Sequence, residues 1–128
     1  MNYYEIKVDI LRDDKTKSEV YLTKQESLIF ADAVAQQVEP IEVTGINKKN
    51  YTDVFDDATK KFFYECKVEF ESLDGNPIKE TYIQKADSLN EARLLLLTNL
   101  DNEPEFKLVK ETNIVDYLII EENEQINV

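Results

Sequence analysis

The sequence has 128 residues with 15 basic and 27 acidic side chains, a net charge of −12, and no histidine. Binding of nucleic acid through its phosphates needs a basic face, so this balance disfavours it. The lack of histidine excludes Ser-His-Asp and Cys-His catalysis and most zinc and iron sites. Hydrophobic residues at 42%, with two glycines and three prolines, indicate a globular chain without long flexible linkers.

The sequence favours a cytoplasmic location. No apolar run reaches the roughly 20 residues that cross a bilayer, and the segment Met1–Glu5 lacks the basic and apolar regions of a secretion signal. Cys66 is the single cysteine, so an internal disulfide is excluded and a buried, unreactive thiol is expected. We predict a protein without a metal or cofactor in a reducing compartment.

The first predicted strand occurs twice. Residues 3–10, Tyr-Tyr-Glu-Ile-Lys-Val-Asp-Ile, alternate between apolar and polar with the period of two that is typical of a half-buried strand. Residues 63–70, Phe-Tyr-Glu-Cys-Lys-Val-Glu-Phe, align with them at an offset of 60 with four identities. This match indicates an internal duplication.

A hairpin turn and a second strand follow in both halves. Residues 12–15 have turn composition, and the Asp-Gly pair at 74–75 predicts a hairpin because glycine accepts the positive φ of a tight turn. The returning strands are predicted over 20–23 and 81–84.

Each half then predicts one helix. Ser88 and Glu91 have the spacing of a capping box at the start of the second helix. Apolar residues recur at three- and four-residue spacing, which is typical of a helix with one buried face. They are Leu28, Ala31, Val34, Ala35 and Val38 in the first helix and Leu89, Ala92, Leu95, Leu96 and Leu100 in the second.

A third strand and a short apolar-acidic ending complete each half. The strands are predicted over 41–44 and 105–109, and the endings over 51–55 and 114–120. The predicted fold class is α+β, with two tandem ββαβ repeats in a pseudo-twofold arrangement and one or two antiparallel-rich sheets packed with two helices.

The two repeats are expected to form one domain. Repeat one covers 1–57, repeat two covers 61–120, and a polar tail covers 121–128. One helix on three strands buries too little surface to be stable alone, so we expect a core that the two copies share.

Two aspartates stand in apolar surroundings. Asp53 and Asp116 hold equivalent positions in the two endings. We interpret both as structural, each capping a helical turn. Catalysis would require a pocket that brings either carboxylate together with lysine or tyrosine, and we expect no enzyme activity.

Aromatic and basic residues share the repeated strands. The rings predicted to point away from the inward faces are those of Tyr3, Tyr21, Phe63 and Tyr82, and the lysines of the first strands are Lys7 and Lys67. Outward rings beside lysines are typical of surfaces on which nucleic-acid bases stack. The interpretation we favour is that the rings form cross-strand pairs or lie between the two copies.

The segments Phe63–Val68 and Ala86–Arg93, with the ending Tyr51–Phe55, resemble an uncharacterised domain-of-unknown-function family of Bacteroidetes and their phages. The resemblance covers nearly the whole chain. Its members open with an aromatic-rich strand and follow the hairpin with a helix of the Ser-x-x-Glu-Ala type. Phe30 departs from this pattern, which leaves the cap of the first helix open. The resemblance implies a source in a gut bacterium or its phage, but no activity and no functional residues.

Two functional hypotheses follow. The first is a non-enzymatic interaction protein of a phage or mobile element, with a role in host takeover, anti-defence or a minor part of the virion. It would bind another protein through an acidic and aromatic surface. The second is a nucleic-acid-binding module that uses outward aromatics and lysines. Aromatics and lysines gathered on one sheet face would favour the second hypothesis, and an acidic band with buried aromatics would favour the first.

Overall fold

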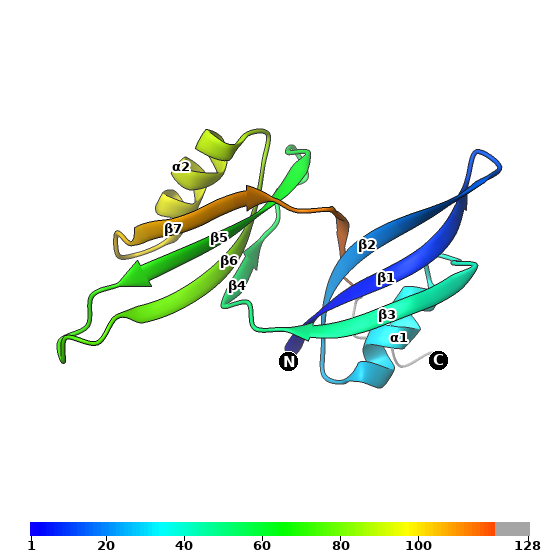
Figure 1. Ribbon diagram of the computed structural model, residues 1–128, viewed down its shortest axis with the longest axis horizontal. Helices are drawn as coiled ribbons and strands as arrows, with labels where there is room; N and C mark the ends of the chain where they lie inside the picture. Colours follow the sequence, from blue (N-terminus) through cyan, green and yellow to red (C-terminus); the bar gives the residue numbers. More distant parts are fainter. Residues whose placement is uncertain (120–128) are drawn as a thin grey trace. The chain divides into compact units, whose positions relative to one another are not determined.

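The computed structural model describes residues 1–119, which form two compact units (Figure 1). Unit 1 comprises residues 1–50 and 114–119, and unit 2 comprises Tyr51–Asn113. The fold of this part of the chain is α+β, with two helices and two mixed sheets of four strands. The predicted polar tail over 121–128 lies outside the described residues.

Unit 1 is a four-stranded sheet with one helix against it. Its elements are β1 (Asn2–Arg12), β2 (Lys15–Gln25), α1 (Leu28–Gln36), β3 (Glu42–Lys49) and β8 (Ile114–Leu118). The strand order is β3-β1-β2-β8, in which β1 is antiparallel to β2 and β3 while β8 runs parallel to β2. Asp13 and Asp14 both adopt positive φ, as the two-residue turn between β1 and β2 requires.

Unit 2 has the corresponding arrangement. Its elements are β4 (Asp53–Phe55), β5 (Phe62–Phe70), β6 (Ile78–Ala86), α2 (Leu89–Asn99) and β7 (Glu105–Glu111). The strand order is β4-β6-β5-β7, and here β4 runs parallel to β6. Gly75 in the β5–β6 turn has a φ of 85°, as the Asp-Gly pair predicts.

The short ending predicted for each half is a strand, β4 in the first half and β8 in the second. Each of these strands joins the sheet formed by the other half of the sequence. β4 follows β3 in sequence but pairs with β6, and β8 follows β7 but pairs with β2.

Chain length explains this exchange. β3 ends at Lys49, which is level with Tyr3 and Lys24. Suppose that the segment after β3 paired instead with the free edge of β2, with Asp53 beside Tyr21 as Asp116 of β8 is. The chain would then have to pass from β3 across β1 and β2, three strand spacings or about 14 Å, and also move about 10 Å along the strands. The three residues between Lys49 and Asp53 span at most about 14 Å when fully extended. That is too short, so the strand enters the other sheet.

Each unit holds an apolar cluster where its helix covers its sheet. In unit 1 the buried members are Ile6, Val8, Ile10, Tyr21, Val34 and Ala35. In unit 2 they are Tyr64, Cys66, Val68, Tyr82, Ala86, Ala92 and Leu96. Of the predicted apolar faces, Ala31, Val34 and Ala35 of α1 and Ala92 and Leu96 of α2 are buried. Leu28 and Leu89, at the start of each helix, are exposed instead.

The two helices begin differently. The hydroxyl of Ser88 accepts a hydrogen bond from the amide of Glu91 at 3.2 Å, which confirms the predicted cap of α2. The Glu91 carboxylate in turn accepts the amide of Asp87. Ser27, at the start of α1, makes no such side-chain bond. Within residues 1–119, neither helix has the length and apolar character to cross a membrane.

Candidate interaction surface

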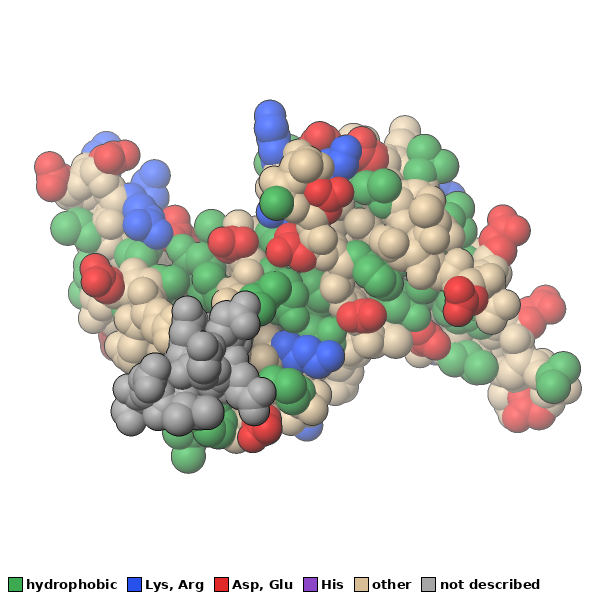
Figure 2. Space-filling view, turned by 180° about the vertical axis from the view of Figure 1, so that it is seen from behind, with side chains coloured by type: hydrophobic (Ala, Val, Ile, Leu, Met, Phe, Trp, Pro, Cys, Tyr) green, Lys and Arg blue, Asp and Glu red, His purple; other side chains and the backbone are tan. Residues whose placement is uncertain are grey.

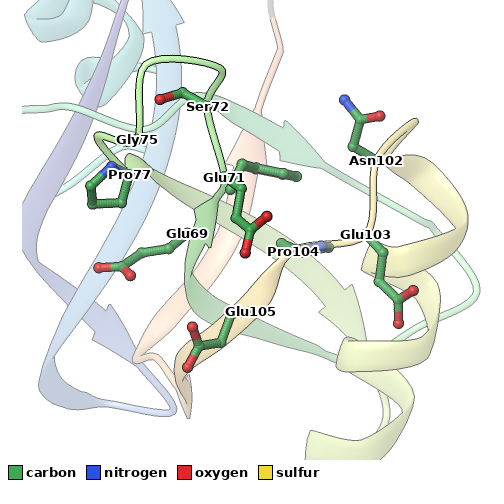
Figure 3. Close-up of a pocket in the computed structure, with 10 residues that line it drawn as sticks. Glu69, Glu71, Ser72, Gly75, Pro77, Asn102, Glu103, Pro104 and Glu105 are labelled. Carbon is green, nitrogen blue, oxygen red and sulfur yellow. The ribbon is translucent and has the colours of Figure 1, made fainter.

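An acidic hollow of about 890 Å³ lies at the hairpin end of unit 2 (Figure 3). Glu69 and Glu71 line it from the end of β5, and Glu103 and Glu105 line it from the segment that enters β7. The β5–β7 pairing places Glu69 opposite Glu105. The register of the sheet therefore brings together carboxylates that are more than 30 residues apart in the sequence.

Only part of this negative charge is neutralised within the unit. The ammonium of Lys107 lies 3.0 Å from the Glu105 carboxylate and 3.5 Å from that of Glu69. The hydrogen bond with Glu105 raises the pKa of Lys107. Glu71 and Glu103 make no ion pair or hydrogen bond with any described residue. Two exposed carboxylates are thus available to an external cation.

The turn beside the hollow is held by its own hydrogen bonds. The Asp74 carboxylate accepts the hydroxyl of Ser72 and, at 2.9 Å, the amide of Asn76. These bonds lower the pKa of Asp74, the Ser72 bond most. Leu73 projects from this turn and is fully exposed. Figure 2 shows acidic and hydrophobic side chains interspersed over this end of unit 2, at the right of the view.

A groove of about 450 Å³ adjoins the hollow, and Phe70, Glu71 and Asn102 line both. Among the apolar side chains that line it, here called its floor, the ring of Phe55 stacks on that of Tyr82 with centroids 5.9 Å apart. The other floor side chains are Phe70, Ile78 and Leu100. The carboxylates that line the groove, here called its rim, are Asp53, Glu71, Glu80 and Asp101, and the uncharged polar residues that line it are Thr52, Asn99 and Asn102. Every charged side chain that lines the groove is acidic.

Nearly the whole chain matches one known protein family. Residues 2–121 match the model of a domain of unknown function, DUF4494. The chain belongs to the DUF4494 family. Neither the curated proteins nor the solved structures include a match. The prediction of an uncharacterised domain family over nearly the whole chain is confirmed.

The four aromatics singled out from the sequence are all buried in this DUF4494 chain. Tyr21 and Tyr82 belong to the apolar clusters under the helices, so the prediction that they point outward is wrong. Tyr3 and Phe63 take the opposite phase of their strands, as predicted, but are only 6% and 1% exposed. A base needs an open ring face to stack on, and none of the four offers one.

The lysines on the strands that carry these aromatics fall into two groups, those that lie over a ring and those that do not. The ammonium of Lys24 lies 5.1 Å above the ring of Tyr3, and that of Lys85 lies 5.0 Å above the ring of Phe63. These cation–π contacts use the ring faces that the nucleic-acid hypothesis requires. Lys7 and Lys67 are exposed and stand at equivalent register shifts of their strands, one in each unit.

Asp53 and Asp116 lie in β4 and β8, so the prediction that they cap helical turns is wrong. Each carboxylate accepts the amide of the next residue, Val54 or Tyr117, at 2.8 Å. The apolar endings are strands because each fills the free edge of a sheet. Short, mainly apolar segments of this kind cannot be told from helical turns by periodicity alone.

Asp53 and Tyr82 do share the groove, the arrangement that an active site would require. The Tyr82 hydroxyl donates a hydrogen bond to Glu80. Burial and this bond raise the pKa of Tyr82, so the phenol stays protonated and is a poor acid at neutral pH. The groove is lined by neither lysine nor cysteine among the described residues.

Sequence reasoning missed the carboxylates of the hollow and, apart from Asp53, those of the groove rim. Their signal is the closely spaced acids of Glu69-Phe-Glu71 and Asp101-Asn-Glu103-Pro-Glu105. Such runs are ordinarily solvated, and only the β5–β7 pairing shows that they converge. Within residues 1–119, no three acidic or cysteine side chains are placed to hold a metal ion.

Proposed function

We propose that this protein is a non-enzymatic interaction protein that binds another protein through the acidic hollow and groove of unit 2. The observation that carries the proposal is the pair of unneutralised carboxylates, Glu71 and Glu103, in an open hollow next to exposed Leu73 and Ile78. Carboxylates set against exposed apolar side chains suit a partner surface of complementary charge, which gains both attraction and burial.

The charge of unit 2 supports this proposal. The unit holds 8 basic and 14 acidic residues, a net charge of −6. Several of its basic groups are already paired: Lys60 with Glu91, and Lys110 with Glu65. A nucleic-acid-binding module finds less support here, because the hollow would repel phosphates and the aromatics proposed for base stacking, Phe63 and Tyr82 in this unit, are buried.

We also propose that the two halves are copies of one ββαββ unit with exchanged last strands. Equivalent interactions support this origin. The Lys24–Tyr3 contact of unit 1 corresponds to Lys85–Phe63 in unit 2, and both third strands shift register at the same position.

We further propose a cytoplasmic role in a Bacteroidetes cell or its phage, in host takeover, anti-defence or the virion. The resemblance of the sequence supports this source. Cys66 is buried in unit 2, and burial raises its pKa to about 12, as suits an unreactive structural thiol.

Site-specific photocrosslinking tests the proposed function. A benzoylphenylalanine at Asn102, which lines both hollow and groove, should crosslink a single protein in nuclease-treated host lysate. The same amino acid at exposed Asn47 of unit 1 is the position control. Crosslinking that is equal at both positions, or that disappears with nuclease, would contradict the proposal.

Charge reversal provides the matched variants. Glu71→Lys combined with Glu103→Lys should abolish the Asn102 crosslink without loss of folding, because neither carboxylate has a partner within the described residues. Glu26→Lys combined with Glu42→Lys, two exposed positions of unit 1, makes the same change in net charge and should leave the crosslink intact.

A further inference from the structure

We infer from the groove of unit 2 that the partner presents a basic amphipathic segment, with an apolar anchor flanked by lysine or arginine. This inference rests on the proposed function and names the chemistry of what that surface binds. The occupant is a protein segment because the groove is lined by apolar side chains together with charged side chains that are all acidic.

The floor offers apolar contact that the unit itself leaves open. Phe55, Phe70 and Leu100 are only partly buried against the core of unit 2, and Ile78 is 48% exposed. All four side chains line the same groove. An aliphatic or aromatic anchor seated there would remove apolar surface from water on both partners.

The rim is negative for two separate reasons. Asp53, Glu71 and Asp101 supply carboxylates, and α2 ends beside them at Asn99. The last turn of α2 carries no basic residue, so its C-terminal partial negative charge is not offset. An acidic residue directly after a helix is unfavourable for the free protein, and a cation from a partner would relieve it.

Other occupants match this groove poorly. Nucleic acid and anionic lipid would bring negative charge to a negative rim. A lysine-rich segment without apolar residues would pair with the carboxylates of the groove but would leave Ile78 and Phe70 exposed to water. Only a segment with both features uses the whole lining.

Fluorescence anisotropy tests the inference with a labelled peptide, Lys-Arg-Leu-Lys-Lys-Leu-Arg-Lys, and the full chain at physiological salt. Two further peptides are controls: one with both leucines replaced by serine, and one with all basic residues replaced by glutamate. We expect the first control to bind about tenfold more weakly, because the anchor burial is lost, and the second not to bind.

Variants of the groove locate the binding. The double variant Glu71→Lys with Asp101→Lys should weaken binding of the leucine peptide about tenfold or more, and so should Ile78→Ser alone. The control variant Glu26→Lys with Glu42→Lys should leave binding unchanged. All changed side chains are exposed, so folding is retained, and circular dichroism verifies it. Equal binding of the serine peptide, or no effect of Ile78→Ser, would overturn the inference.

The two proposals can fail separately. If a partner crosslinks at Asn102 and requires Glu71 and Glu103, but no groove variant affects the peptide, the proposed function stands and the basic amphipathic occupant is wrong. If neither crosslink nor peptide depends on this surface, both are wrong.

Discussion

Replacement of Thr23 by valine should destabilise unit 1 through its link to β8. Thr23 lies on β2 with no exposed surface. Its hydroxyl donates to the carbonyl oxygen of Leu118 at 2.9 Å and accepts from the side-chain amide of Gln25 at 3.1 Å. Valine has nearly the same shape and β-propensity but can do neither.

The magnitude follows from these contacts. Two lost hydrogen bonds cost about 1 kcal/mol each, and the methyl group that replaces the hydroxyl regains about 0.8 kcal/mol. We expect the free energy of unfolding to fall by about 1 kcal/mol. Thr44 is the matched control: it donates to the carbonyl of Lys7 at 3.2 Å but is exposed, so water replaces the bond and Thr44→Val should change stability by less than about 0.5 kcal/mol.

Urea unfolding followed by amide NMR signals measures both variants unit by unit. Amides of β2 and β8 should report the loss for Thr23→Val. The reasoning would be refuted if Thr23→Val and Thr44→Val had the same effect, since burial of the hydroxyl would then not matter. A loss confined to signals of unit 2 would contradict the placement of β8.

Three further predictions concern the core, the caps and the thiol. Leu96→Ala should cost about 2–5 kcal/mol because Leu96 is fully buried, whereas Leu94→Ala, at a position 65% exposed, should cost less than about 0.5 kcal/mol in the same urea assay. Ser88→Ala should remove about 1 kcal/mol of stability and Ser27→Ala distinctly less, because only Ser88 caps its helix; equal losses would contradict the cap assignment. Burial raises the pKa of Cys66 to about 12, so from about pH 9 the unfolded thiol ionises while the folded one does not, and stability should fall with rising pH. A thiol reagent at pH 8 should therefore modify Cys66 only as fast as the protein unfolds, and rapid labelling of the native protein would contradict its burial.

Local patterns in the sequence determined much of each unit. The period-two alternation of residues 3–10 and 63–70 predicts β1 and β5, and the three-and-four spacing in each half predicts α1 and α2. The capping pair of Ser88 and Glu91 is likewise local, because both groups lie within one helical turn. Such features depend on neighbours within a few residues, which the sequence displays directly.

Long-range pairing was decided only by the tertiary structure. Asp53 and Asp116 became strand residues because β4 and β8 cross to the other unit, which the short connections enforce. Tyr21 and Tyr82 became core residues because the helices cover that face of each sheet. Glu69 met Glu105 through the β5–β7 register. A sequence states which side chains are charged or apolar, but the groups that meet across a sheet are chosen by register and strand order, to which every residue of the unit contributes.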